Sequence, residues 1–159
     1  EGKGWVLRNS KGQYTLTLDG LKAGSLERKT PALEIQGDLT LVLKKGTESE
    51  LLSADAALKK GAGTLTIRGE GSLRLQGETA LEGEWKEETL NQDEPSALRI
   101  EGGKLVFTGE ETALYEDTVE LAGGEIQIQC LNGKGTGIRA HTLDDRHFSG
   151  SLEMEESEE

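Results

Sequence analysis

The stretch that decides the fold lies at residues 62–77 and reads AGTLTIRGEGSLRLQG. Leu65 and Ile67 alternate with polar side chains before a glycine-rich corner. Leu73 and Leu75 alternate in the same way after it. Alternation with a period of two is typical of a strand that buries one face. The stretch therefore predicts two short strands on either side of a tight bend.

Copies of this stretch recur along the chain. IEGGKLVF at residues 100–107 and LAGGEIQI at residues 121–128 repeat the strand, bend, strand pattern. A small residue followed by Leu or Ile opens each copy, at intervals of about 24 residues once an insertion of about ten residues is removed. These openings end at Leu33, Leu58, Leu81, Leu114 and Ile138. The repeat predicts an all-β fold, a right-handed single-stranded parallel β-helix (solenoid) of about five short coils.

Successive coils of a solenoid stack their inward side chains into ladders. The predicted inward residues before the corner are Leu39/Leu41, Leu65/Ile67, Leu98/Ile100, Val119/Leu121 and Leu143, and those after it are Leu73/Leu75, Leu105/Phe107, Ile126/Ile128 and Leu152/Met154. Gly102-Gly103 and Gly123-Gly124 should stack at one corner, because glycine adopts a positive φ at little cost. The corner at residues 69–71 has one residue more, which predicts a bulge in the stack there.

The length of 159 residues suits one domain, which we assign to residues 1–159. The atypical start predicts an N-terminal β cap at residues 1–30, opened by a hairpin. Coils follow at residues 31–154, and an acidic tail with a frayed end occupies residues 155–159.

Two segments break the strand pattern. Residues 84–96, EWKEETLNQDEPS, are predicted to project as a loop or short helix. Residues 44–55 are predicted to lengthen the first coil and to hold a brief turn. Trp5 and Tyr14 are expected in the core of the cap, and Cys130 is expected to be a small buried hydrophobe.

Charge restricts the partners. The net charge is −12, and residues 81–159 carry 6 Lys and Arg against 20 Asp and Glu. Phosphate binding needs clustered cations, so the acidic chain disfavours nucleic acid and an anionic membrane surface. No apolar run approaches the roughly 18 residues of a membrane span, so we expect no membrane insertion.

The chain also resembles a known family. The segments that carry the likeness are YTLTLDGL (14–21), ALEIQGDLTLVLKKGT (32–47), AGTLTIRGEGSLRLQG (62–77), ALRIEGGKLVF (97–107) and TVELAGGEIQI (118–128). They resemble the parallel β-helix domains of Gram-positive bacterial surface proteins described as carbohydrate-binding domain-containing proteins. The resemblance implies a secreted or wall-attached bacterial protein that binds plant polysaccharide such as acidic pectin, with calcium in some members.

Catalytic residues are not predicted. His141 and His147 lie in the degenerate last coil beside Asp144 and Asp145, with no Ser in a nucleophile-elbow context. These side chains suit a solvated loop better than a metal site. A polysaccharide lyase or hydrolase is therefore the least favoured function.

Four residues are candidates for carbohydrate binding: Arg68, Arg74, Trp85 and Tyr115. Aromatic faces stack on sugar rings and arginines pair with carboxylates, although an aromatic on a loop such as Trp85 more often packs down as a lid over the neighbouring coil. An acidic ligand would meet a predicted basic face of Lys59, Lys60, Arg68, Arg74 and Arg99.

Glu116 and Asp117 offer hard oxygen ligands for calcium, or else form a solvated turn. Together these features predict a non-catalytic extracellular carbohydrate-binding or adhesion module. The alternative is a rigid structural spacer or adhesin domain.

Overall fold

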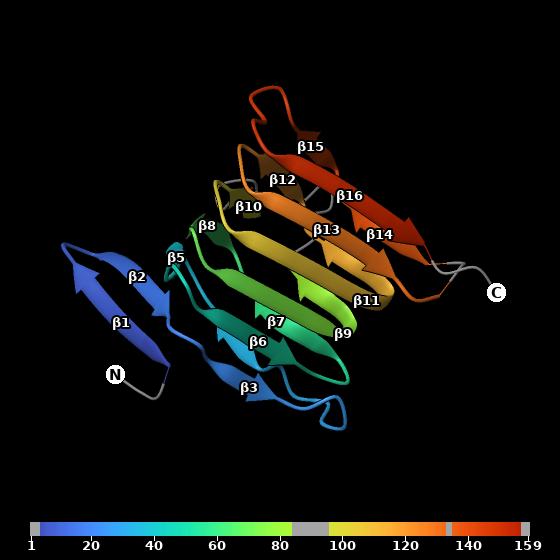
Figure 1. Ribbon diagram of the computed structural model, residues 1–159, viewed down its shortest axis with the longest axis horizontal. Coiled ribbons are helices and arrows are strands. Elements are labelled where there is room, and N and C mark those ends of the chain that lie inside the picture. The colour runs from blue at the N-terminus through green and yellow to red at the C-terminus, as the bar shows by residue number, and fades with distance from the viewer. Residues whose placement is uncertain (1–3, 84–95, 133–134, 157–159) are drawn as a thin grey trace.

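The computed structural model describes residues 4–83, 96–132 and 135–156. The strands form parallel sheets arranged as a β-solenoid of about 5 turns, which confirms the predicted all-β coil architecture (Figure 1). The structure contains no helix among its described residues that is long and apolar enough to cross a membrane.

Three faces surround the core. The first face consists of β1 (Trp5–Ser10), β2 (Gln13–Leu18), β5 (Leu39–Leu43), β8 (Gly63–Gly69), β10 (Ser96–Ile100), β12 (Thr118–Leu121) and β15 (Thr142–Asp144). The second face consists of β3 (Lys22–Gly24), β6 (Glu48–Leu52), the first halves of β9 (Ser72–Glu82) and β11 (Lys104–Tyr115), β13 (Glu125–Cys130) and β16 (Ser151–Glu156). The third face consists of β4 (Leu33–Ile35), β7 (Ala56–Lys60), the second halves of β9 and β11, and β14 (Thr136–Arg139).

The predicted ladders are present on all three faces, but their last predicted members Leu143, Leu152 and Met154 pair in register and are nevertheless exposed at the C-terminal end of the stack. On the first face Leu65 is the partner of Leu39 and Leu98, and on the second Leu75 is the partner of Phe107. The predicted coil openings form the third ladder, Leu33–Leu58–Leu81–Leu114–Ile138. Inward side chains of the middle coils are fully buried, so the ladders form one continuous hydrophobic core.

The double-glycine corners also stack as predicted. Ile100 pairs with Leu121 before the corner and Lys104 with Glu125 after it, which aligns the glycines between them. Gly103 and Gly124 have φ of 99° and 93°, a region that side chains with a Cβ rarely adopt.

The longer corner at residues 69–71 does not displace the strands beside it. Ile67 stays in register with Ile100, and Ser72 with Lys104, so the turn itself absorbs the extra residue. The register shift lies instead between Gly109 and Thr112, where β11 passes from the second face to the third.

Two boundary predictions need correction. Only β1 caps the solenoid: it pairs antiparallel with β2 as the predicted hairpin, but β2 itself pairs in parallel with β5. The first coil therefore begins at Gln13 and not at residue 31. Trp5 packs against the core as expected, whereas Tyr14 is 45% exposed at the open end. At the other end β16 extends to Glu156, into the predicted tail.

Residues 44–55 are not an extension of the coil. They contain β6, whose Ser49 and Leu51 face inward in register with Leu73 and Leu75. The Ser49 hydroxyl accepts a hydrogen bond from the Leu21 amide at 3.0 Å, which satisfies this buried polar side chain. An inward Ser hid the apolar alternation in the sequence. Cys130 is buried, as predicted.

Candidate functional site

A polar groove runs along the corner between the first and second faces. Its volume is about 690 Å³, and it is lined by Gly20, Lys22, Lys45, Gly46, Thr47, Glu48, Glu70, Gly71, Ser72 and Lys104. We call it the lysine groove. It includes part of the GEG corner at residues 69–71, beside which Arg68 and Arg74 were predicted to bind a ligand.

Backbone hydrogen bonds between coils hold the groove in shape. The Ser72 amide donates to the Thr47 carbonyl at 2.9 Å, and the Lys104 amide donates to the Gly71 carbonyl at 3.0 Å. A tight turn at Gly46, with φ of 82°, projects Lys45 outward. The three lysines thus come from the first, second and fourth levels of the stack, and the third level contributes Glu70 and Ser72 between them.

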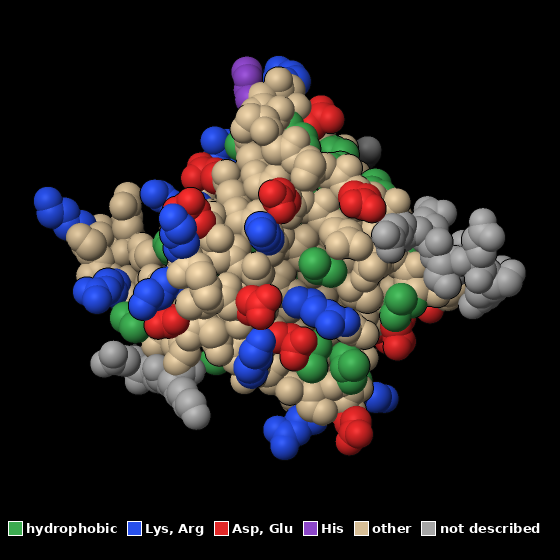
Figure 2. Space-filling model, in the orientation of Figure 1, with side chains coloured by type: hydrophobic (Ala, Val, Ile, Leu, Met, Phe, Trp, Pro, Cys, Tyr) green, Lys and Arg blue, Asp and Glu red, His purple; other side chains and the backbone are tan. Residues whose placement is uncertain are grey.

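The predicted arginines flank this groove without lining it. Arg68 lies exposed on the first face, and Arg74 lies on the second. The Arg74 guanidinium donates to Gln76 Oε1 at 2.8 Å and lies 3.9 Å from the Glu50 carboxylate. Figure 2 shows basic and acidic side chains intermixed over the second face.

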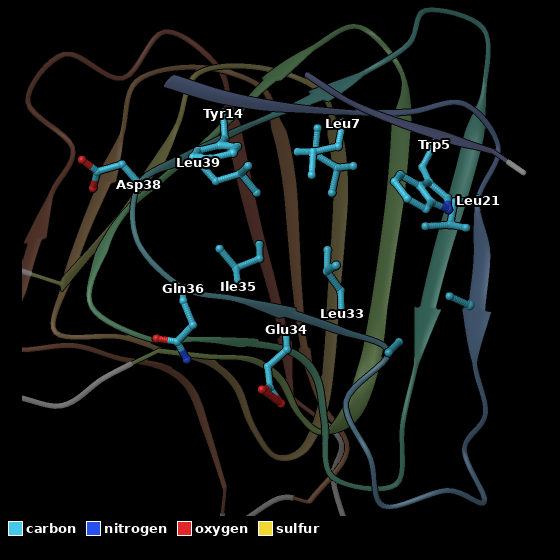
Figure 3. A pocket seen from close by; sticks show the side chains of 13 residues that line it. Trp5, Leu7, Tyr14, Leu21, Leu33, Glu34, Ile35, Gln36, Asp38 and Leu39 are labelled. Atoms are coloured by element: carbon cyan, nitrogen blue, oxygen red, sulfur yellow. The ribbon is translucent and has the colours of Figure 1, made fainter. Parts of the chain in front are cut away.

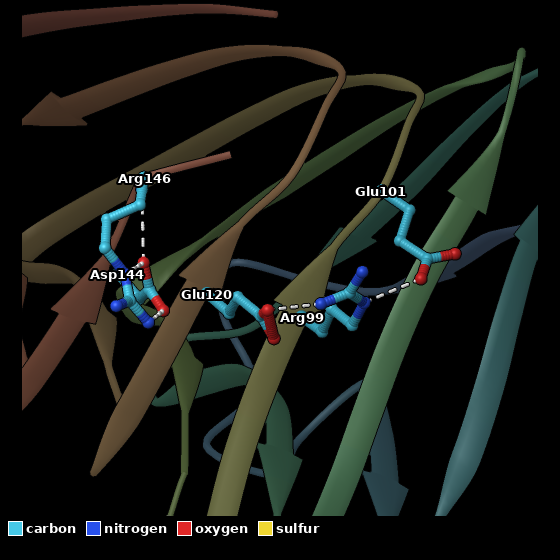
Figure 4. A network of polar contacts seen from close by, with 5 residues as sticks. All are labelled: Arg99, Glu101, Glu120, Asp144 and Arg146. Atoms are coloured by element: carbon cyan, nitrogen blue, oxygen red, sulfur yellow. Dashed lines mark hydrogen bonds and ion pairs between the residues drawn. The ribbon is translucent and has the colours of Figure 1, made fainter. Parts of the chain in front are cut away.

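The predicted basic face does not exist as one surface. Lys59 is exposed on the third face, whereas the Lys60 side chain points into the core and is 0% exposed. Arg99, on the first face, lies between Glu101 and Glu120, and both carboxylates accept its hydrogen bonds (Figure 4). These contacts raise the pKa of Arg99 further above its usual range. Its charge is therefore already compensated.

Only one of the two aromatic candidates lies within the described residues. Trp85 lies outside the described residues. Tyr115 is half-buried on the third face, and the guanidinium carbon of Arg139 lies 5.8 Å from its ring centroid. Arg139 therefore occupies one face of the ring on which a sugar would stack.

The predicted calcium ligands point away from each other. Glu116 is buried, with its Oε2 2.9 Å from Lys60 Nζ, and Asp117 Oδ1 lies 2.5 Å from His141 Nδ1. No cluster of three or more His, Cys, Asp or Glu that could hold a metal occurs among the described residues. Calcium binding therefore remains a prediction without a described ligand cluster.

A buried polar network near the corner between the third and first faces was not predicted. Lys60 Nζ donates to Ser96 Oγ at 2.9 Å and to the Gly61 carbonyl at 3.0 Å. Ser96 Oγ donates to Glu116 Oε1 at 2.6 Å, and the Asp117 amide donates to the same oxygen at 2.8 Å. Glu116 Oε2 faces Lys60 as an ion pair without a well-directed hydrogen bond. The network joins three coils through the core.

No family model, curated protein or solved structure matches the chain. The resemblance to Gram-positive carbohydrate-binding β-helix proteins therefore remains a prediction.

The last corner carries an exposed ion pair whose titration can be predicted. Arg146 donates hydrogen bonds to Asp144 from its side chain, at 2.9 and 3.0 Å, and from its backbone amide at 3.1 Å (Figure 4). These bonds, the side-chain ones first, lower the pKa of Asp144 from 3.8 to about 2. The raised pKa of Arg146 has the same cause.

We expect Arg146→Ala to return the pKa of Asp144 towards 3.8, as measured by NMR of the side-chain carboxyl carbon. Because the folded-state pKa lies below the unfolded value, the pair stabilises the corner above pH 3.8, and this contribution is lost as the pH falls through about 2. Arg139→Ala, in the preceding strand, is the control and should leave that pKa low. An unchanged pKa in Arg146→Ala would contradict the assignment.

Proposed function

We propose that this chain is a non-catalytic carbohydrate-binding or adhesion module of a secreted or surface-attached bacterial protein. Its ligand is an acidic polysaccharide, which the lysine groove binds without calcium. The observation that carries the proposal is the convergence of Lys22, Lys45 and Lys104 on one open groove. The resemblance noted in the sequence supports the same class of ligand.

The chemistry of the groove fits a chain of uronic acids. Ammonium groups attract carboxylates, while Thr47 and Ser72 offer hydroxyl groups that can exchange hydrogen bonds with sugar hydroxyls. An open groove admits the middle of a polymer, whereas a closed pocket admits only an end. Among the described residues, Lys45 and Lys104 form no side-chain ion pair, so ligand binding does not require an existing pair to break.

Replacing Lys45 and Lys104 together by Ala is expected to weaken binding to polygalacturonate about tenfold, since each exposed charge pair contributes up to about 1 kcal/mol. Calorimetry at low salt with EDTA present measures this effect. Added salt should weaken the wild-type interaction in the same experiment, because it screens exposed charges.

The matched control removes two lysines elsewhere. Lys11 and Lys59 are both exposed and lie outside the groove, so Lys11→Ala/Lys59→Ala changes the net charge equally. Equal weakening in both variants would mean that only overall charge matters. If only Arg68→Ala/Arg74→Ala weakened binding to polygalacturonate, the binding site would lie at the two arginines predicted from the sequence and not in the lysine groove.

A rigid structural role is the second candidate, favoured by the continuous ladders that make the core one unit from Leu16 to Ile128. A glycan array probed with and without calcium separates the two, because a spacer binds no glycan in either condition. An enzyme would instead release unsaturated or reducing-end products from pectin during a long incubation.

A further inference from the structure

The N-terminal end of the solenoid contains an apolar hollow of about 390 Å³, away from the lysine groove. Figure 3 shows Trp5, Leu7 and Tyr14 on one side of it and Leu33 and Ile35 on the other, directed toward the same space. Leu7 is 48% exposed there. The volume and the apolar lining are those of a binding site for an apolar group or a short peptide.

The hollow exists because the faces end at different levels. On the first face β1 adds one strand beyond β2. Within residues 4–83, β3 pairs only with β6 and β4 only with β7, so the second and third faces end one strand lower. The hollow is therefore one strand deep, and β4 presents an edge of unpaired backbone groups. Such an edge is a template for another strand.

The register on β4 determines which side chains that strand needs. Leu33 and Ile35 point into the hollow, while Glu34 between them points away from it (Figure 3). On the opposite edge of β4, Glu34 has Lys59 as its partner in β7, so a basic residue already occupies the matching position there. Asp38 adds a second acid at the rim. A strand on the free edge thus requires two apolar residues with Lys or Arg between them.

We propose that the hollow receives a β-strand donated by a separate polypeptide, an extended apolar–basic–apolar segment that adds in parallel to β4. This is binding by strand addition, in which backbone hydrogen bonds supply affinity and alternate side chains supply specificity. A second copy stacked end to end is a poorer occupant. Because β1 extends one strand beyond the level of β4, the second copy would contact β1 first and would leave the hollow unfilled.

Titration of the whole protein with a short TVKVT peptide tests the proposal. We expect saturable shifts of the β4 backbone amides in NMR spectra, and binding about tenfold weaker for a TVEVT peptide, since the central charge then repels Glu34. Glu34→Lys should reverse this preference. Because Glu34 is exposed, the variant should fold as the wild type does.

Other results would overturn the inference. The first is that neither peptide gives a saturable shift at millimolar concentration. The second is that both peptides bind equally to the wild type and to Glu34→Lys. The third is a concentration-dependent dimerisation that blocks peptide binding, which would assign the hollow to a second copy of the chain. Lys45→Ala/Lys104→Ala leaves the hollow intact and should bind TVKVT normally, so failure of the lysine groove and failure of the hollow are distinguishable.

Discussion

Replacing Lys60 by Met is expected to lower the free energy of unfolding by about 3–5 kcal/mol, because it leaves the carboxylate of Glu116 buried without its cation. Both side chains are 0% exposed. Ser96 and the Asp117 amide would still donate to Glu116, but neutral donors do not replace an ammonium group. Equilibrium unfolding in urea, followed by circular dichroism, measures the loss.

A double variant tests whether the unpaired carboxylate of Glu116 causes the loss of stability. Lys60→Met/Glu116→Gln removes both charges while keeping an acceptor for Ser96, so it should recover most of the lost stability. Lys59→Met, the exposed neighbour on the same strand, is the control and should change the free energy by less than about 0.5 kcal/mol. Equal losses for Lys59→Met and Lys60→Met would contradict a buried pair.

Replacing Phe107 by Ala is expected to lower the free energy of unfolding by about 3–5 kcal/mol, through lost burial and the cavity left behind. Phe107 is 0% exposed and lies between Leu75 and Ile128 in the ladder of the second face. Each coil of a solenoid contacts only its neighbours, so a defect in a middle coil weakens the contact with both sides. Urea unfolding again measures the effect.

The adjacent residue provides the control. Val106 is half-buried on the outer side of the same strand, so Val106→Ala should cost less than about 1 kcal/mol. A similar loss at both positions would mean that Phe107 does not face the core. A lower slope of the unfolding transition in Phe107→Ala would show that the coils on either side unfold separately.

Most of the fold could be predicted because alternation and repeat length are local properties of the sequence. Leu65, Ile67, Leu73 and Leu75 define two strands, and their copies one coil later define which strands pair. Where the inward position is polar, the pattern fails. Ser49 hid β6 in this way, because its burial depends on a hydrogen bond from Leu21, which no local pattern reveals.

The candidate site was predicted less well than the fold. The GEG corner at residues 69–71, which the sequence singled out as a place for a ligand, contributes to the lysine groove, but Arg68 and Arg74 lie to either side of the groove. The lysines that line the groove are far apart in the chain, and only the stacking of coils brings Lys22, Lys45 and Lys104 together. No spacing rule within one repeat contains that information.

The sequence by itself determined most of the strands, their period, the stacked glycines and the ladders on either side of the corner, because these depend on side-chain alternation and on the φ that glycine allows. Only the tertiary structure decided where charges lie. Lys60 follows Lys59 in an exposed-looking pair, yet pleating turns one ammonium into the core and the other to solvent. The buried charge is stable there because Glu116, two coils away, was brought within 2.9 Å.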